Sequence, residues 1–219
     1  MNQKDIIKHY RSNQKKIESR LEEFNELRNS SDIRKFEELS FVILTSQTDA
    51  KNAWQAVKKL REDSLILEGE KEEISDVLEN STISYSKDKA DYIVKNRENL
   101  SQPTLADPER KVKINSRIDA ENLESTREWF SENIKGISWK GASHFLRNIG
   151  YGNGFAIISS HIASQLFDLG LTDNPEPPKN RKQYLSKEEA LQDLAENTGI
   201  DIKALDLVLW SMKTGEVFK

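Results

Sequence analysis

Apolar residues recur every three or four positions along most of the chain, which is the spacing that predicts amphipathic helices. The first such segment covers residues 2–28, where charged residues separate the apolar positions Ile6, Ile7, Tyr10, Ile17, Leu21, Phe24 and Leu27. A second segment follows Ser30 or Ser31, either of which can cap it, and its second half is nearly all apolar up to Leu44. A helix of that composition is expected in the middle of the fold.

Further helices are predicted along the rest of the chain, and no strand pattern persists. They fall near 49–60, 70–79, 87–99, 121–133 and 139–148, and then in the segments after 159, 186 and 201. Their predicted N-caps are the polar cluster 45–48 for the helix at 49–60, then Asp119, Ser159 or Ser160, a capping box of Ser186 with Glu189, and Asp201. Residues 100–118 contain two prolines and little periodicity, so we interpret them as the connection between two lobes of a single domain, 1–219.

The segment 134–149 predicts a hairpin between two helices. Gly136 lies where the chain must turn sharply, and glycine accepts the positive φ that such a turn needs. The second helix then runs over 139–148 with its inner face formed by Ala142, Phe145, Leu146 and Ile149. The turn of such a hairpin can present backbone N–H groups to a phosphate.

The charges around this hairpin favour an anionic partner. No Asp or Glu occurs between Asn133 and Phe167, although the chain has 37 acidic residues, while Lys135, Lys140 and Arg147 are basic. Lys140 lies on the first turn of its predicted helix, where the helix dipole opposes a positive charge and favours the neutral, nucleophilic amine.

Composition excludes several classes of function. The chain has no cysteine and three histidines, so we expect neither disulfides nor a metal site, and no cofactor. The net charge of −4 argues against indiscriminate nucleic-acid binding and leaves a local basic face possible. No apolar run is long enough to span a membrane, and the N-terminus lacks the apolar segment of a signal peptide, so a cytoplasmic, monomeric protein is expected.

The hairpin sequence K-G-I-S-W-K-G-A-S-H-F-L-R-N-I-G-Y resembles that of the archaeal-type 8-oxoguanine DNA glycosylase/lyases, the second family of such enzymes. The resemblance extends to E-L-S-F-V-I-L-T-S-Q-T at 38–48, K-A-D-Y-I at 89–93 and the C-terminal L-D-L-V-L-W-S-M-K-T-G-E-V-F-K at 205–219. It implies an all-α, two-lobed helix–hairpin–helix fold and, as partner, double-stranded DNA with a damaged base or an abasic site.

The resemblance also implies roles for individual residues. Lys140 would attack the anomeric carbon of the damaged nucleotide. The residues implied to contact DNA are Lys135, Gly136, Ser138, Arg147 and Gln47. Trp210 and the terminal Lys219 would hold the extruded base, and the apolar Val217 and Phe218 suggest that the tail folds back onto the protein.

The chain departs from the family at an acidic position. The family carries an aspartate nineteen residues after the lysine, in a phrase such as I-L-D-R-H-I, whereas this chain reads I-I-S-S-H-I. Ser159 therefore stands at the position of the aspartate, Ser160 replaces an arginine, and Ser138 replaces the second glycine of the hairpin. Ser159 can cap a helix about as well as aspartate, but it supplies no negative charge.

Three hypotheses follow from the sequence. The first is a lysine-dependent DNA glycosylase/lyase of base-excision repair that acts on oxidised guanine, weakened in base excision by the missing aspartate. The second is a DNA-binding protein, specific for a lesion or structure, that cleaves abasic sites only or has no activity. The third is a helical interaction module without DNA binding, which the acid-free hairpin disfavours.

Overall fold

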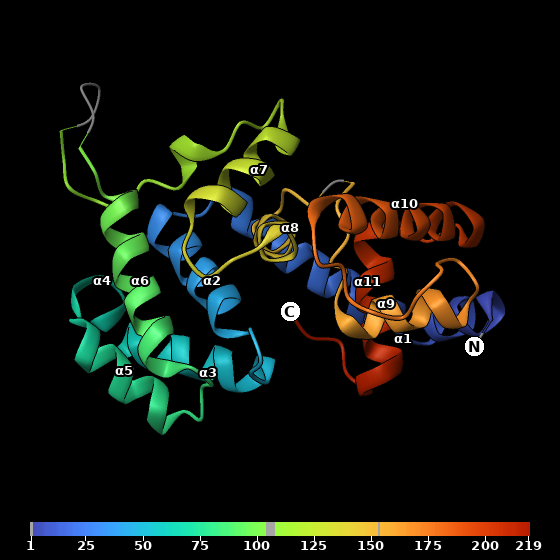
Figure 1. Ribbon diagram of the computed structural model, residues 1–219, viewed down its shortest axis with the longest axis horizontal. Helices are drawn as coiled ribbons and strands as arrows, with labels where there is room; N and C mark the ends of the chain where they lie inside the picture. The colour runs from blue at the N-terminus through green and yellow to red at the C-terminus, as the bar shows by residue number, and fades with distance from the viewer. Residues whose placement is uncertain (1, 104–107, 153) are drawn as a thin grey trace. The chain divides into compact units, whose positions relative to one another are not determined.

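The computed structural model describes residues 2–103, 108–152 and 154–219, and the regular secondary structure in these ranges is entirely helical (Figure 1). The α-helices are α1 (Gln3–Glu26), α2 (Asp32–Leu44), α3 (Ala50–Glu62), α4 (Leu65–Glu68), α5 (Lys71–Asn80), α6 (Ser86–Leu100), α7 (Leu123–Asn133), α8 (Trp139–Asn148), α9 (Ser160–Asp168), α10 (Arg181–Thr198) and α11 (Ile202–Thr214). The predicted all-α class is confirmed. Within the described ranges, no helix has the length and apolar character needed to cross a membrane.

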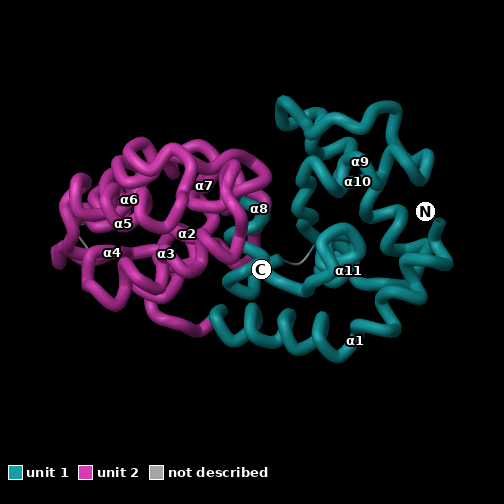
Figure 2. Tube along the Cα trace, turned by 90° about the horizontal axis from the view of Figure 1, so that it is seen from below, with its two compact units in different colours: residues 1–28, 142–219 teal, residues 29–141 magenta. Residues whose placement is uncertain are grey.

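The chain is divided into two compact units (Figure 2). Unit 1 consists of Met1–Arg28 with Ala142–Lys219, and unit 2 consists of Asn29–Gly141. The chain therefore passes between the units at 28–29 and at 141–142. The segment 100–118, which we predicted to connect two lobes, lies instead within unit 2.

The start of helix α2 explains why the described part of that segment stays in unit 2. Asp32 accepts hydrogen bonds from the backbone N–H groups of Ile114 at 2.8 Å and Asn115 at 2.6 Å, and Lys35 donates to the side chain of Asn115. Ile114 is fully buried. Long-range hydrogen bonds and one buried apolar side chain thus attach a stretch that has little periodicity of its own.

Unit 2 is built around α2, as its apolar pattern predicted. Ser31 caps the helix, and every residue from Lys35 to Leu44 is buried. Helices α3 and α6 pack against α2, and α5 packs against α6. Asp49 caps α3 directly after the polar cluster 45–48, and its side chain accepts from two backbone N–H groups.

Unit 1 is assembled on α11. Helices α1, α9 and α10 all pack against it, and its residues from Ala204 to Leu209 are buried. Asp201 caps α11 as predicted, and Gly215 ends it with a φ of +81°. A left-handed residue after the last turn is the common way to end a helix, and glycine adopts it without steric cost.

Two predicted caps are wrong. Asn122 caps α7 through Ser125 N, whereas Asp119 accepts from Glu121 N and Asn122 N in the preceding turn. Helix α10 starts at Arg181, because Asn180 caps it six residues before Ser186 of the predicted box with Glu189. In both places another polar side chain, closer to the first helical residue, satisfies the free N–H groups.

Arg147 lies inside unit 1 and does not fit the predicted role in DNA binding. Its residue is 4% exposed, its guanidinium lies over the ring of Phe24 at 4.6 Å, and Nη1 lies 3.4 Å from Oδ2 of Asp206. Burial raises the pKa of Asp206, and the charge of Arg147 opposes that rise. Arg147 therefore joins α8, α1 and α11, and its charge serves an internal ion pair.

We predict that Arg147→Met destabilises the protein by about 3–5 kcal/mol at neutral pH, because Asp206 keeps a buried charge without its partner. Without Arg147 the pKa of Asp206 rises further, so protonation restores stability as pH falls towards the ordinary aspartate value of ~3.9. Urea unfolding at pH 4.5 and 7.5 measures this, and we expect a smaller loss at the lower pH.

The double variant Arg147→Met/Asp206→Leu serves as the control, since removing both charges should restore much of the lost stability. Unchanged unfolding of Arg147→Met at both pH values, together with weaker DNA binding, would return Arg147 to the DNA surface.

Candidate functional site

The predicted hairpin is present between α7 and α8. Its turn covers residues 134–138, and Gly136 has a φ of +84°. Lys135, Gly136 and Ser138 are exposed. Helix α8 has the predicted bounds, and its inner residues Ala142, Phe145, Leu146 and Ile149 are fully buried.

Two side chains of α6 hold this turn from within unit 2. Asn96, which is 1% exposed, accepts a hydrogen bond from Lys135 N at 2.8 Å and donates to Lys135 O at 2.9 Å. The ring of Tyr92 lies against Gly136, where a Cβ atom would come within 2.5 Å of Tyr92 Cδ2. Glycine is therefore required here both for its φ and for its lack of a side chain.

Lys140 lies on the first turn of α8, directly after the hairpin. Its side chain is half-buried, and burial lowers the pKa of its amine below the usual lysine value. It forms no ion pair with any described residue of unit 2. The preceding Trp139 stacks on Arg127 of α7, with the guanidinium 4.6 Å from the ring centroid. The first turn of α8 is thus fixed, and it carries an amine biased towards its neutral form.

Gln47 lies on an exposed corner of unit 2, on the turn that follows α2. Its backbone is in the left-handed region with a φ of +52°, and so is that of its neighbour Tyr85 at +57°. Ser84 Oγ donates to Gln47 O at 2.8 Å, and the Tyr85 hydroxyl donates to Gln47 Oε1 at 3.4 Å. Tyr85 is 61% exposed. Sequence reasoning missed Tyr85, whose only signal was an aromatic residue just before a helix.

Ser159 caps α9 in unit 1, as predicted, and its Oγ accepts from Ile162 N at 3.3 Å. The strand-like stretch before it is held by α10. The Tyr184 hydroxyl donates to Ala156 O at 2.5 Å, and a buried carboxylate oxygen of Glu188 accepts from Ala156 N at 2.9 Å. These side chains fix the position of residue 159 even though its own side chain is small. No feature of the sequence had indicated Tyr184 or Glu188.

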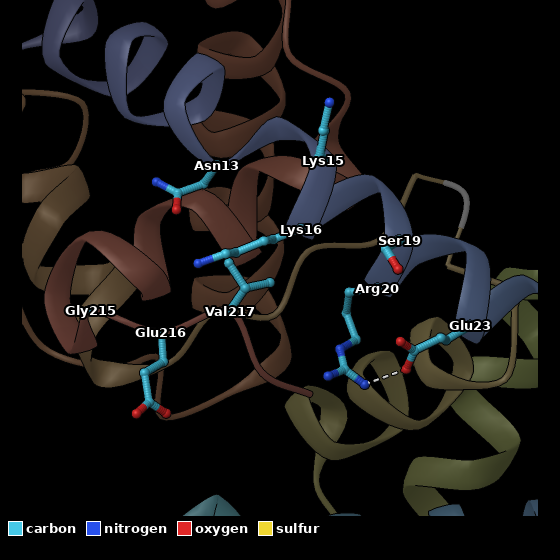
Figure 3. A pocket seen from close by; sticks show the side chains of 9 residues that line it. All are labelled: Asn13, Lys15, Lys16, Ser19, Arg20, Glu23, Gly215, Glu216 and Val217. Atoms are coloured by element: carbon cyan, nitrogen blue, oxygen red, sulfur yellow. Dashed lines mark hydrogen bonds and ion pairs between the residues drawn. The ribbon is translucent and has the colours of Figure 1, made fainter.

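The C-terminal tail folds back onto α1, as predicted from its apolar residues. Phe218 lies under the guanidinium of Arg20 at 5.9 Å, and Val217 lines a pocket of about 590 Å³ with residues of α1 (Figure 3). In that pocket Lys16 points along Val217, while Arg20 points towards Glu23. Trp210 on α11 and the terminal Lys219 are half-buried in the same unit.

The structure thus groups the predicted site residues by unit. Gln47, the hairpin turn and Lys140 belong to unit 2, whereas Ser159, Trp210 and Lys219 belong to unit 1. That both groups meet around one nucleotide stays a prediction.

Comparison with known proteins places this chain in a family. Residues 17–200 match the model of the family described as 8-oxoguanine DNA glycosylase. An 8-oxoguanine DNA glycosylase/AP lyase of Fusobacterium nucleatum is 36% identical over 216 residues, which cover 98% of this chain and 96% of that protein.

Comparison with solved structures supports the same family. The 8-oxoguanine glycosylase/lyase of Methanocaldococcus jannaschii, in complex with a 15mer DNA containing 8-oxoguanine, has a TM-score of 0.83 and 32% identity, covering 97% of this chain and 99% of that one. The 8-oxoguanine DNA glycosylase of Thermotoga maritima has a TM-score of 0.86 and 29% identity, covering 99% and 98%. The all-helical fold of the described residues and its match to these structures place the chain among the helix–hairpin–helix DNA glycosylases. Within that class, the chain belongs to the 8-oxoguanine DNA glycosylase family.

Gly136→Ala should weaken binding to duplex DNA about tenfold or more, because a positive φ and a clash with Tyr92 displace the hairpin at a cost of ~1–3 kcal/mol. Gly199→Ala is the matched control, since Gly199 also has a positive φ (+66°) but has no atom near its Cβ position. Fluorescence anisotropy with a labelled duplex measures both. Equal affinities for the two variants would show that the hairpin turn is not the DNA surface.

Proposed function

We propose that this chain is a DNA repair enzyme that excises 8-oxoguanine and cleaves the resulting abasic site through a covalent bond to Lys140. The observation that carries the proposal is Lys140 itself. It follows a phosphate-binding type of hairpin, it lies on the first turn of a helix, and burial lowers its pKa. The family and the DNA-bound relative from M. jannaschii support the same chemistry.

The hairpin would fix the position of the DNA. The backbone N–H groups of the exposed turn around Gly136 are suited to one phosphate, and the exposed Lys135 adds charge beside it. The damaged nucleotide must leave the helix stack before its C1′ atom can be reached. Gln47 and the exposed ring of Tyr85 are proposed to face the lesion from unit 2, and Trp210 and Lys219 are proposed to hold the extruded base from unit 1.

The reaction then proceeds in two stages, excision of the base and cleavage of the strand. The neutral amine of Lys140 attacks C1′, the glycosidic bond breaks, and its electron pair leaves with the base, which takes up a proton. The sugar ring opens to a protonated Schiff base, which acidifies the C2′ hydrogens. Loss of a C2′ proton expels the 3′ phosphate, and water then hydrolyses the Schiff base and releases Lys140.

Ser159 is proposed to divide the two activities. Base departure builds positive charge on the sugar, and the family aspartate would stabilise that charge. Ser159 retains the capping hydrogen bond to Ile162 N and provides no charge. Cleavage of an abasic site needs only the amine and an aldehyde, so it depends less on the missing carboxylate. The same observation favours the second candidate function, a protein that binds damaged DNA and acts on abasic sites only.

Lys140→Gln should abolish the covalent complex that borohydride traps between the protein and abasic DNA, because glutamine cannot form the imine whose reduction leaves a stable bond between the protein and the sugar. In the parent protein, the trapping rate should rise with pH as the amine loses its proton. It should level off below 10.5, the ordinary lysine pKa, since burial lowers that of Lys140. Lys182→Gln, at an exposed position of α10, is the control. Trapping that survives in Lys140→Gln would identify a different nucleophile.

Ser159→Asp should raise the excision rate of 8-oxoguanine by about a hundred-fold to a thousand-fold, the usual value of one well-placed electrostatic group, and raise abasic cleavage much less. Both rates are measured by single-turnover gel assays on matched duplexes. Ser160→Asp adds the same charge one residue along, at an exposed site, and should change neither rate as strongly. Fast excision by the parent that Ser159→Asp leaves unchanged would show that another carboxylate stabilises the sugar.

A further inference from the structure

Lys89 of α6 is a buried lysine whose amine faces the end of α2. The residue is 3% exposed, and its Nζ donates to Leu44 O at 2.9 Å, to Ser46 O at 2.6 Å and to Thr48 Oγ1 at 3.1 Å. An ammonium group has three N–H donors, so each donor has one acceptor. Burial lowers the pKa of Lys89 to about 8, which shows that the charge is held against a desolvation cost.

All three acceptors belong to one turn, residues 44–48, and this turn carries Gln47. A non-glycine residue in the left-handed region costs about 1 kcal/mol or more and persists only where its surroundings hold it. The exposed side chain of Gln47 gains no buried packing from this conformation. Packing in the core therefore does not explain the strained backbone of Gln47.

A second set of hydrogen bonds holds the same turn. Ser84 N donates to Thr48 Oγ1 at 3.1 Å, and Ser84 Oγ donates to Gln47 O at 2.8 Å. Thr48 thus accepts from both Lys89 and the segment that carries Tyr85. The turn is held from α6 and from the segment preceding it, with Gln47 at its exposed tip.

The same helix also holds the hairpin. Asn96 lies seven residues after Lys89, which is two helical turns, so both side chains leave α6 on one face. Lys89 binds the turn at 44–48, and Asn96 binds the hairpin at Lys135. One rigid element therefore sets the distance between the two surfaces of unit 2 that are proposed to contact DNA.

We propose that Lys89 is a positioning residue for lesion recognition, whose ammonium group holds Gln47 in the left-handed conformation that faces the damaged base. This inference rests on the proposed function. It adds a residue that touches no DNA and acts through Gln47. A buried apolar side chain would avoid the cost of burying a charge at this position, but it would remove the Lys89 donor from Leu44 O and from Ser46 O.

The test measures the preference of the protein for a damaged duplex. In a Lys140→Gln background, which prevents turnover, dissociation constants are determined for two duplexes that differ only in 8-oxoguanine or guanine at one position. Lys89→Met keeps the length and apolar stem of the side chain. It should reduce the ratio of the two constants about tenfold, as expected for the loss of one well-oriented contact. Lys95→Met, an exposed lysine on the same helix, should leave the ratio unchanged.

A double-mutant cycle separates positioning from general stability. If Lys89 acts through Gln47, then Lys89→Met should have no further effect on the ratio once Gln47→Ala is present. Cleavage of an abasic site, assayed with Lys140 intact, should change little in Lys89→Met because no base is there to recognise. Where Lys89→Met fails to fold by circular dichroism, Thr48→Val removes one acceptor of the same ammonium and should lower the ratio in the same direction.

The outcomes distinguish this inference from the proposed function. An unchanged ratio in folded Lys89→Met, or an equal loss in the Gln47→Ala background, would overturn the positioning role alone. A parent protein with no preference for the 8-oxoguanine duplex would overturn the proposed function, and the positioning role with it.

Discussion

The carbonyl groups at the end of helix α2 must find hydrogen-bond donors where Leu44, the last residue of the helix, is fully buried. Lys89 contributes to meeting this constraint, because its ammonium group donates to Leu44 O at the end of the helix and to Ser46 O and Thr48 Oγ1 in the turn that follows. Much of unit 2 follows from this interaction, because the helix that carries Lys89 also carries Asn96 and so holds the hairpin. Lys89 and Asn96 are buried polar side chains, and they hold the two exposed turns of unit 2 at 44–48 and 134–138.

At position 159 the structural role of the side chain, capping a helix, can be separated from its proposed chemical role. The cap of α9 needs an oxygen acceptor and is kept, with Ile162 N as its donor. Under the proposed function the negative charge of the family aspartate is missing, and its absence would act in two opposite ways. A carboxylate near the amine would raise the pKa of Lys140, so without one burial alone would favour the neutral nucleophile. The cationic sugar would also lack a stabilising charge, and for base departure we expect this second effect to be the larger.

Arg147 and Lys135 show how similar charges in one acid-free stretch come to differ in role. Lys135 is exposed on the turn, and Asn96 binds its backbone. Arg147 lies a further twelve residues along, on the buried side of α8, and meets Asp206. The acid that neutralises it lies 59 residues away in the sequence, so a local count of charges cannot detect the pair. Basic residues near a hairpin indicate a DNA surface only where no distant acid reaches them.

The sequence by itself determined the helical class, the buried course of α2, the hairpin around Gly136 and the bounds of α8. All of these depend on local periodicity or on the φ that glycine allows. Tertiary structure alone decided that 112–117 attaches to α2, that Arg147 is internal, and that buried polar side chains hold turns within each unit, Lys89 and Asn96 in unit 2 and Tyr184 and Glu188 in unit 1. Those placements depend on hydrogen bonds and ion pairs between residues far apart in the chain. The sequence alone does not distinguish a polar side chain that is buried from one that is solvated.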